Sequence, residues 1–151
     1  MICVDASLAA KWIFPEDYSL QALALLSDNV EAKERIVAPP LLSIELANVI
    51  RQRMLRKSLT LDDAKRLLNQ FWSLSIAVVA PAMLSEEALV IAHDFNLPAV
   101  YDAHYVALAR MLGCDLWTND QRLLRTLENR LPFVKWIGDY RSGQPRGGLG
   151  T

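Results

Sequence analysis

The chain begins with Ile2-Cys3-Val4-Asp5-Ala6-Ser7, an apolar run that ends on an acidic residue. Short runs of β-branched and apolar residues are typical of buried strands, and a helix is expected to follow Asp5. Ligands of open parallel sheets bind beyond the carboxyl ends of the strands, near the point where the strand order reverses. Asp5 is therefore expected at an edge of the sheet where a site can form.

Four further short runs have the same character as the first strand. They comprise residues 35–38, 76–79, 115–118 and 133–137. Longer segments of helical periodicity separate these runs. The alternation predicts an α/β fold, in which a central parallel sheet is covered by helices.

Capping residues mark the ends of several helices. Pro39 and Pro40 precede a helix that we expect to run to about Lys57, and Gly113 is expected to end the helix before the next strand. Thr60 and Ser85 each place a hydroxyl group before acidic first-turn residues, so both are predicted to cap helices.

Length and composition indicate one compact domain. The chain has 151 residues, of which 52% are hydrophobic, and a chain of this size buries about 68–70% of its unfolded surface. We expect the domain to span residues 1–141. Residues 142–151 are rich in glycine and lack apolar periodicity, so they are predicted to form a disordered tail.

Charge and hydropathy limit the classes of partner. The net charge is −1 and the isoelectric point is about 6.1, which excludes a global cationic field and leaves a local patch for any nucleic-acid site. Asp5 and Lys11 interrupt the apolar N-terminus, which lacks the charged start of a signal peptide. No run approaches the 18 or so apolar residues of a membrane span, and the sequence predicts a soluble, cytoplasmic protein.

Three aspartates stand at predicted starts of helices. Asp5 ends the first strand, Asp120 follows the strand that contains Leu116, and Asp102 heads the apolar stripe of a helix expected over 102–112. Aspartate is also a favoured helix cap, worth about 1 kcal/mol. Taken singly, each aspartate is explained as well by capping as by a functional site.

Glu45 is not explained by capping. Helical spacing places it on a mostly apolar face with Leu41, Leu42, Asn48 and Val49. A carboxylate on such a face is expected to be paired or to bind a cation, because an unpaired buried charge costs several kcal/mol. The alternatives are a salt bridge to a lysine such as Lys11 and a solvent-reaching position at the end of the stripe.

Convergence of the four acids would create a site for a cation. Like charges that meet repel one another unless a cation lies among them. No histidine or cysteine joins the group, and an all-oxygen donor set favours magnesium or manganese over zinc.

Four segments in order resemble the motifs of the PIN-domain ribonucleases, especially the VapC-type toxins of toxin–antitoxin pairs. The segments are Val4-Asp5-Ala6-Ser7 with Lys11-Trp12, Glu45-Leu46-Ala47-Asn48, Tyr101-Asp102-Ala103 and Thr118-Asn119-Asp120. The resemblance spans residues 2 to about 137. It implies a three-layer α/β/α PIN-like fold and activity as a metal-dependent endoribonuclease.

The resemblance also implies the roles of individual residues. Those that would hold Mg²⁺ or Mn²⁺ and carry the catalysis are, in chain order, Asp5, Glu45, Asp102 and Asp120, here called the four site acids. Ser7 and Thr118 are auxiliary polar groups that would orient a carboxylate or a water. The implied partners are an RNA substrate, a cognate VapB-type antitoxin and a second copy of the chain in a homodimer.

Local cations are candidates for binding the substrate. Lys11 lies close to Asp5 in sequence, and Arg51 and Arg53 follow Glu45 on its helix. Cations also favour the carboxyl end of a helix for structural reasons, so a solvated helix end is the alternative for the two arginines.

Two other classes of protein that carry acidic residues at strand ends fit the sequence less well. A haloacid-dehalogenase-like phosphatase needs a second aspartate two positions after the first, where this chain has Ser7. A receiver domain needs an acid pair after the first strand, which is absent. The remaining rival is a PIN-like module that binds RNA or protein without cleavage.

Two other polar residues are expected to lie outside the site. Asp115 is at the start of a strand, and His104 is on another face of its helix.

Overall fold

The computed structural model describes residues 1–56 and 59–143. The predicted end of one helix at about Lys57 and most of the predicted tail, 144–151, lie outside the described residues. Within them, the hydroxyl of Ser142 donates a hydrogen bond to Asp28 at 2.9 Å.

Five parallel strands form the central sheet, as predicted. They are β1 (Ile2–Val4), β2 (Ile36–Ala38), β3 (Ala77–Val78), β4 (Asp115–Thr118) and β5 (Val134–Trp136). The strand order is β3-β2-β1-β4-β5, and every neighbouring pair is parallel. The chain moves outward from β1 on one side and returns on the other, so the order reverses between β1 and β4.

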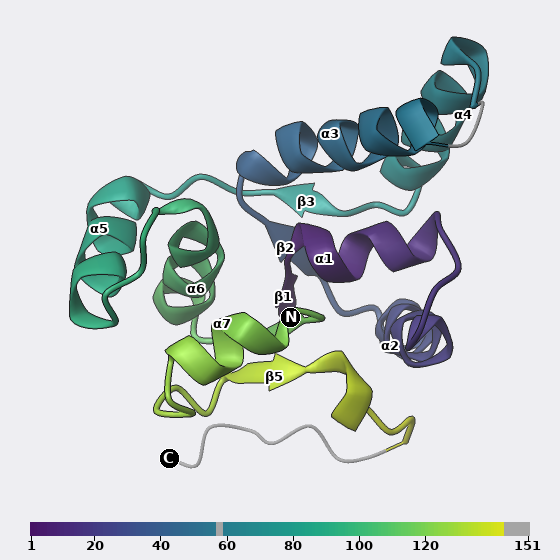
Figure 1. Cartoon of the computed structure of the whole chain (residues 1–151). Helices are drawn as coiled ribbons and strands as arrows, with labels where there is room; N and C mark the ends of the chain where they lie inside the picture. The colour runs from purple at the N-terminus through teal and green to yellow at the C-terminus, as the bar shows by residue number, and fades with distance from the viewer. Residues whose placement is uncertain (57–58, 144–151) are drawn as a thin grey trace.

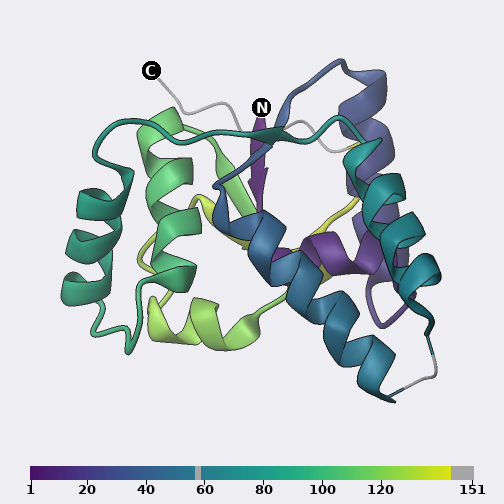
Figure 2. The ribbon, with the colours of Figure 1, turned by 90° about the horizontal axis from the view of Figure 1, so that it is seen from above.

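Helices connect and cover the strands. They are α1 (Ala6–Ala9), α2 (Ser19–Glu31), α3 (Leu41–Arg56), α4 (Leu61–Trp72), α5 (Leu84–Asp94), α6 (Tyr101–Leu112) and α7 (Gln121–Thr126), with short 3₁₀ turns over Ala10–Trp12 and Ile137–Asp139. Helices α5 and α6 lie on one side of the sheet, and α2 and α4 lie on the other (Figure 1, Figure 2). This arrangement is the three-layer fold predicted from the sequence. Within the described ranges, no helix combines the length and the apolar character that a membrane crossing needs.

Two of the three predicted helix-end residues are confirmed. Thr60 caps α4 in a reciprocal capping box with Asp63, and Gly113 ends α6 with a left-handed φ of 63°. The prediction for Ser85 is wrong, because α5 begins one residue earlier and its capping position is Met83. Met83 turns the chain into the helix in a left-handed conformation with a φ of 69°, and Leu84, the first residue of α5, is buried.

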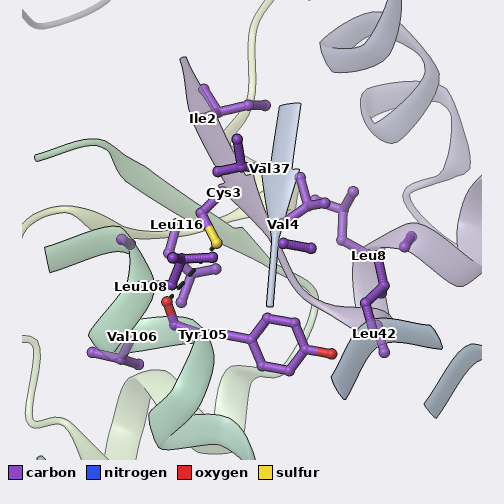
Figure 3. Packing of buried hydrophobic residues seen from close by; sticks show 14 of the residues in the cluster. Ile2, Cys3, Val4, Leu8, Val37, Leu42, Tyr105, Val106, Leu108 and Leu116 are labelled. Atoms are coloured by element: carbon purple, nitrogen blue, oxygen red, sulfur yellow. Dashed lines mark hydrogen bonds between the residues drawn. The ribbon is translucent and has the colours of Figure 1, made fainter. Parts of the chain in front are cut away.

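The core lies where β1, β2 and β4 meet α1, α3 and α6. Cys3, Val4 and Leu116 are fully buried on the central strands, and Leu108 packs against them from α6. Tyr105 extends this core towards the carboxyl ends of the strands, and its hydroxyl points towards Leu42 on α3 (Figure 3). The core therefore brings α3 and α6 together at the edge of the sheet where the strand order reverses.

Candidate active site

The reversal of strand order places two of the four site acids side by side. Asp5 follows the end of β1, and Asp120 lies two residues beyond the end of β4. The backbone amide of Asp5 donates to the carbonyl oxygen of Trp117 at 3.4 Å, so the two strand ends are directly connected. Helices α3 and α6 contribute Glu45 and Asp102.

Asp5 is held by both predicted auxiliary hydroxyls. Ser7 Oγ donates to Asp5 Oδ1 at 2.7 Å, and Thr118 Oγ1 donates to Asp5 Oδ2. The backbone amide of Leu8 also donates to Oδ1, at 2.9 Å, so Asp5 caps α1 as well. The carboxylate is buried and fixed in one orientation by residues from both strand ends.

Asp120 caps α7 and, within the described residues, is the only site acid that forms an ion pair. Its Oδ1 accepts from the backbone amide of Arg122 at 2.8 Å, and its Oδ2 lies 3.1 Å from Arg122 Nη2. Its own backbone amide donates to Thr118 Oγ1 at 2.9 Å. Thr118 therefore contacts both aspartates at the strand ends. The capping alternative is correct for Asp5 and Asp120, but it does not exclude a site.

Glu45 faces the core, but not as an ion-pair partner. The hydroxyl of Tyr105, 60 residues away on α6, donates a hydrogen bond to Glu45 Oε2. Lys11 forms its ion pair with Glu16, at 3.7 Å, instead of with Glu45. The apolar stripe is also shorter than predicted, because Leu42 is buried but Asn48 is exposed.

Asp102 does not cap its helix. Helix α6 begins at Tyr101 with Val100 in the capping position, so Asp102 is the second helical residue. The capping alternative is therefore wrong for this aspartate. Within the described part of the chain, its carboxylate has no hydrogen bond or ion pair. Tyr105, one turn further along α6, is buried and points to Glu45.

The pKa values show that the acids influence one another. Burial raises the pKa of Asp5 to about 6, against its hydrogen bonds from Thr118 and Ser7, and the charge of Asp102 adds to the rise. Burial raises the pKa of Glu45, against the hydrogen bond from Tyr105 and again with a contribution from Asp102. Desolvation and then the charge of Asp120 raise the pKa of Asp102 itself. Asp102 thus interacts electrostatically with each of the other three site acids.

Asp120 behaves differently from the other three acids. Partial burial works to raise its pKa, but the hydrogen bonds and the charge of Arg122 outweigh burial, and the pKa falls below its usual range. Burial and the hydrogen bond to Glu45 raise the pKa of Tyr105, so this hydroxyl remains a donor.

The four site acids fit a hard divalent cation by their chemistry. All their donor atoms are oxygens, and three of the acids have pKa values raised by desolvation together with a like charge, a penalty that a cation would relieve. No three acidic, histidine or cysteine side chains of the described residues are close enough to enclose an ion. Side-chain movement or bridging waters would be needed, as is common for Mg²⁺.

The predicted substrate-binding cations lie in three different environments. Arg53 pairs with Glu16 and lies over the Phe14 ring, 4.8 Å from its centroid. The Lys11 side chain is only 2% exposed, whereas Arg51 is exposed on another face of α3.

Two cavities flank Asn119 at this edge of the sheet. The first, of about 680 Å³, is lined by Ser7, Glu45, Asn48, Gln52, Arg53 and Arg56, among others. The second, of about 690 Å³, is lined by Lys11, Asp120, Gln121, Arg122 and Arg125, among others, and we call it the Lys11 cavity. Arg51 lines neither of them. Of the four site acids, Glu45 lines the first cavity and Asp120 lines the Lys11 cavity, and Asn119 lines both.

Sequence reasoning missed Tyr105 and Arg122 as partners of the site. Tyr105 has a recognisable signal, because a tyrosine on an apolar stripe needs a hydrogen-bond partner for its hydroxyl. Arg122 follows Asp120 by two residues and is within reach of its carboxylate. Asp115 and His104 lie apart from the group: Asp115 pairs with Lys135 at 2.7 Å, and His104 contacts Val100 and Ser85.

Known proteins resemble the chain over most of its length. The family model described as "PIN domain" matches residues 2–128. VapC ribonuclease Mb0985 of Mycobacterium bovis is 34% identical over 134 residues, which cover 89% of this chain and 97% of that protein. Ribonuclease VapC3 of Pyrobaculum aerophilum is 33% identical over 126 residues, which cover 81% and 91%. The crystal structure of PAE2754 from Pyrobaculum aerophilum matches with a TM-score of 0.67 at 23% identity, and it covers 91% of this chain and 89% of that one.

Proposed function

This chain belongs to the PIN-domain family and to its VapC-type ribonucleases, and we propose that its four site acids hold the divalent ion with which it hydrolyses RNA. The family implies the use of a divalent metal ion, and the all-oxygen donor set favours Mg²⁺ or Mn²⁺. One observation carries the proposal. Asp5, Glu45 and Asp102 have raised pKa values, and the charge of Asp102 contributes to the rise at both of the others. Within the described residues, none of the three forms an ion pair.

Several side chains orient the acids that would bind the ion. Asp5 is fixed by Ser7 and Thr118, so one ligand is in place before any cation binds. Tyr105 orients Glu45 in the same way from α6. A bound divalent ion would supply Lewis acidity, which activates a water as the nucleophile and offsets the charge on the phosphodiester.

No side-chain nucleophile is required in this scheme. Water attacks the phosphorus in line with the leaving oxygen, and the products carry a 5′-phosphate and a 3′-hydroxyl, as the resemblance implies. We assign contacts with the RNA backbone to Arg53, which lines the first cavity together with Glu45. Arg51 lines neither cavity, so we expect it to contribute less.

The proposed partners are a VapB-type antitoxin and a second copy of the chain. VapC-type ribonucleases are toxins paired with such antitoxins, which supports the first. An apolar cavity of about 500 Å³ beside exposed Ile44, Met83 and Tyr101 supports the second, because apolar patches of this kind mark interaction surfaces. Light scattering of the purified protein measures its oligomeric state.

A cleavage assay tests the main proposal. Purified protein is incubated with single-stranded RNA in Mg²⁺, in Mn²⁺ and in excess chelator, and the ends of the fragments are identified. We expect cleavage with either ion and none with chelator. Full cleavage in chelator would overturn the metal mechanism, and a lack of cleavage under all conditions would favour a PIN-like module that only binds RNA or protein.

A further inference from the structure

We propose that the Lys11 cavity is a binding site for a phosphate group of the RNA, and that this site opens when a divalent ion replaces Arg122 on Asp120. The inference rests on the proposed function, because it takes Asp120 as a ligand of the ion. It adds to that function a second anion site beside the reacting phosphate. The replacement of Arg122 by the ion on Asp120 would couple metal binding to phosphate binding at this second site.

Lys11 is the first observation behind this proposal. Its side chain is 2% exposed, lines the cavity, and makes no hydrogen bond within the described residues. Its ion pair with Glu16 spans 3.7 Å, which is too long for a hydrogen bond. A buried ammonium group has three donors and costs several kcal/mol unless they are used. An anion in the cavity would use them.

Arg122 is the second observation. Its guanidinium is 81% exposed and reaches back to Asp120, with Nη2 3.1 Å from Oδ2 and Nε 3.4 Å from Oδ1. A solvent-exposed ion pair of this kind is weak, about 0–1 kcal/mol, so a divalent ion competes with it effectively. A divalent ion that binds Oδ2 would compete with Nη2 for that oxygen, and a displaced guanidinium would remain at the wall of the cavity.

The charges around the cavity show why the ion matters. Three basic residues, Lys11, Arg122 and Arg125, are balanced by three acids, Glu16, Asp17 and Asp120. The lining is therefore neutral as it stands, and it has no net attraction for phosphate. A divalent ion on Asp120 would change the balance to an excess of two positive charges. Phosphate binding and metal binding should then strengthen each other.

The side chains that would contact the phosphate suit its chemistry. Lysine supplies a point charge, and arginine supplies a planar fork of donors for two phosphate oxygens. The amide groups of Asn119 and Gln121 line the same cavity and add neutral donors. Asn119 also lines the first cavity, beside Glu45. A strand that runs from Glu45 in the first cavity towards Asp120 would thus pass over Asn119 and place a phosphate in the Lys11 cavity.

A binding experiment with inorganic phosphate tests the site without any turnover. Calorimetric titrations are made with the parent protein in saturating Mg²⁺ and in chelator. We expect phosphate to bind at least tenfold more tightly with Mg²⁺. Equal affinity in the two buffers would overturn the proposed exchange.

Two variants separate the cavity from the ion itself, because phosphate can also bind directly to Mg²⁺. Lys11→Met and Arg122→Met should lose most of the Mg²⁺-dependent gain in phosphate affinity, while the exposed control Lys65→Met keeps it. Arg122→Met should also bind Mg²⁺ several-fold more tightly in phosphate-free buffer, because Asp120 no longer has a competing partner. Unchanged phosphate binding in both variants would show that the ion alone holds the phosphate.

RNA cleavage distinguishes a strand phosphate from free phosphate. Lys11→Met should raise KM much more than it lowers kcat, and it should reduce the salt dependence of kcat/KM by about one phosphate contact. An unchanged salt dependence, with phosphate binding lost, would assign the cavity to free phosphate and overturn the proposal for RNA. If the parent cuts RNA only with metal but neither titration behaves as expected, the cavity proposal fails and the proposed function stands. If the parent never cuts RNA, the proposed function fails first.

Discussion

The acids at the two ends of strand β4 differ in their ion pairing. At its amino end, Asp115 pairs with Lys135 on the neighbouring strand β5 at 2.7 Å, and the lysine lies 5.8 Å from the centroid of the Trp117 ring. At its carboxyl end lies Asp120, the only one of the four site acids that forms an ion pair within the described residues. The acid at the amino edge is thus neutralised by an ion pair, whereas three of the four site acids form none within the described residues.

On the proposed function, the difference separates Asp115, which serves stability, from acids that bind a ligand. A partly buried carboxylate that serves only stability is expected to have a partner, because an unpaired one costs free energy. Glu45 and Asp102 raise the free energy of the folded protein when they are charged. Desolvation raises both pKa values, and the charge of Asp102 adds to the rise at Glu45, as the charge of Asp120 does at Asp102. Such a cost is typical of sites that need the charge for a ligand.

The largest expected effect is on activity at the carboxyl edge. Asp102→Asn should lower RNA cleavage by a factor on the order of 10³, because it removes the charge that couples the four site acids. The matched control is Asp115→Asn at the amino edge, which should keep the parental rate. Initial rates with excess Mg²⁺ measure both. Equal losses in the two variants would remove the functional distinction between the edges.

The next effect is on stabilisation by metal. An ion present at 100 times its dissociation constant stabilises the folded state by about 2.7 kcal/mol, so Mg²⁺ should raise the melting temperature of the parent protein. Glu45→Gln should lose most of this rise, whereas Lys11→Met should retain it in phosphate-free buffer. If Glu45→Gln melts far below the parent in chelator and still gains the full rise, Glu45 is a structural residue.

A smaller effect is expected from the hydroxyl that orients Glu45. Tyr105→Phe should weaken Mg²⁺ binding by about 10- to 100-fold, as loss of a group that holds a metal ligand does, and it should cost about 1 kcal/mol of stability. Tyr140→Phe is the matched control, because it removes a hydrogen bond to Asp28 of 2.6 Å away from the four site acids. Calorimetry with Mg²⁺ and urea denaturation measure the two quantities. A comparable loss of metal affinity in the control variant contradicts the special role of Tyr105.

The smallest effect is expected at the neutralised edge. Asp115→Asn should destabilise the protein by about 0–1 kcal/mol, because its ion pair with Lys135 is partly exposed on both sides. Urea denaturation at low and high salt measures this difference, which should shrink as salt screens the pair. A loss of several kcal/mol would show that this edge depends on its charges as strongly as a buried ion pair does.

The sequence predicted the strand ends well because they depend on local signals. The apolar run that ends at Val4 is followed by Asp5, and the run that ends at Thr118 is followed by Asn119 and Asp120. The alternation of such runs with helices implies one parallel sheet. The rule for reversals of strand order then places Asp5 and Asp120 at the same edge. Ser7 and Thr118 followed from the resemblance, and their hydrogen bonds to Asp5 agree with the predicted orienting role.

Contacts between distant helices could not be predicted in this way. The hydrogen bond from Tyr105 to Glu45 joins residues 60 positions apart and depends on how α3 packs against α6. The predicted start of α5 was wrong because the chain turns into the helix at Met83, in a left-handed conformation, instead of at Ser85. The ion pair of Lys11 with Glu16 likewise depends on the path of the loop after α1, for which the sequence has no periodic signal.

The contact between Thr118 and Asp5 has a consequence for protein synthesis. It joins residues 113 positions apart, and it closes only when strand β4 pairs beside β1. Ribosomes add about 5–20 residues per second, and domains fold as units during synthesis. A nascent chain that has already exposed Asp5, Glu45 and Asp102 still lacks the strand that fixes Asp5 and delivers Asp120. On the proposed function, the four site acids therefore come together only after strand β4 has been synthesised.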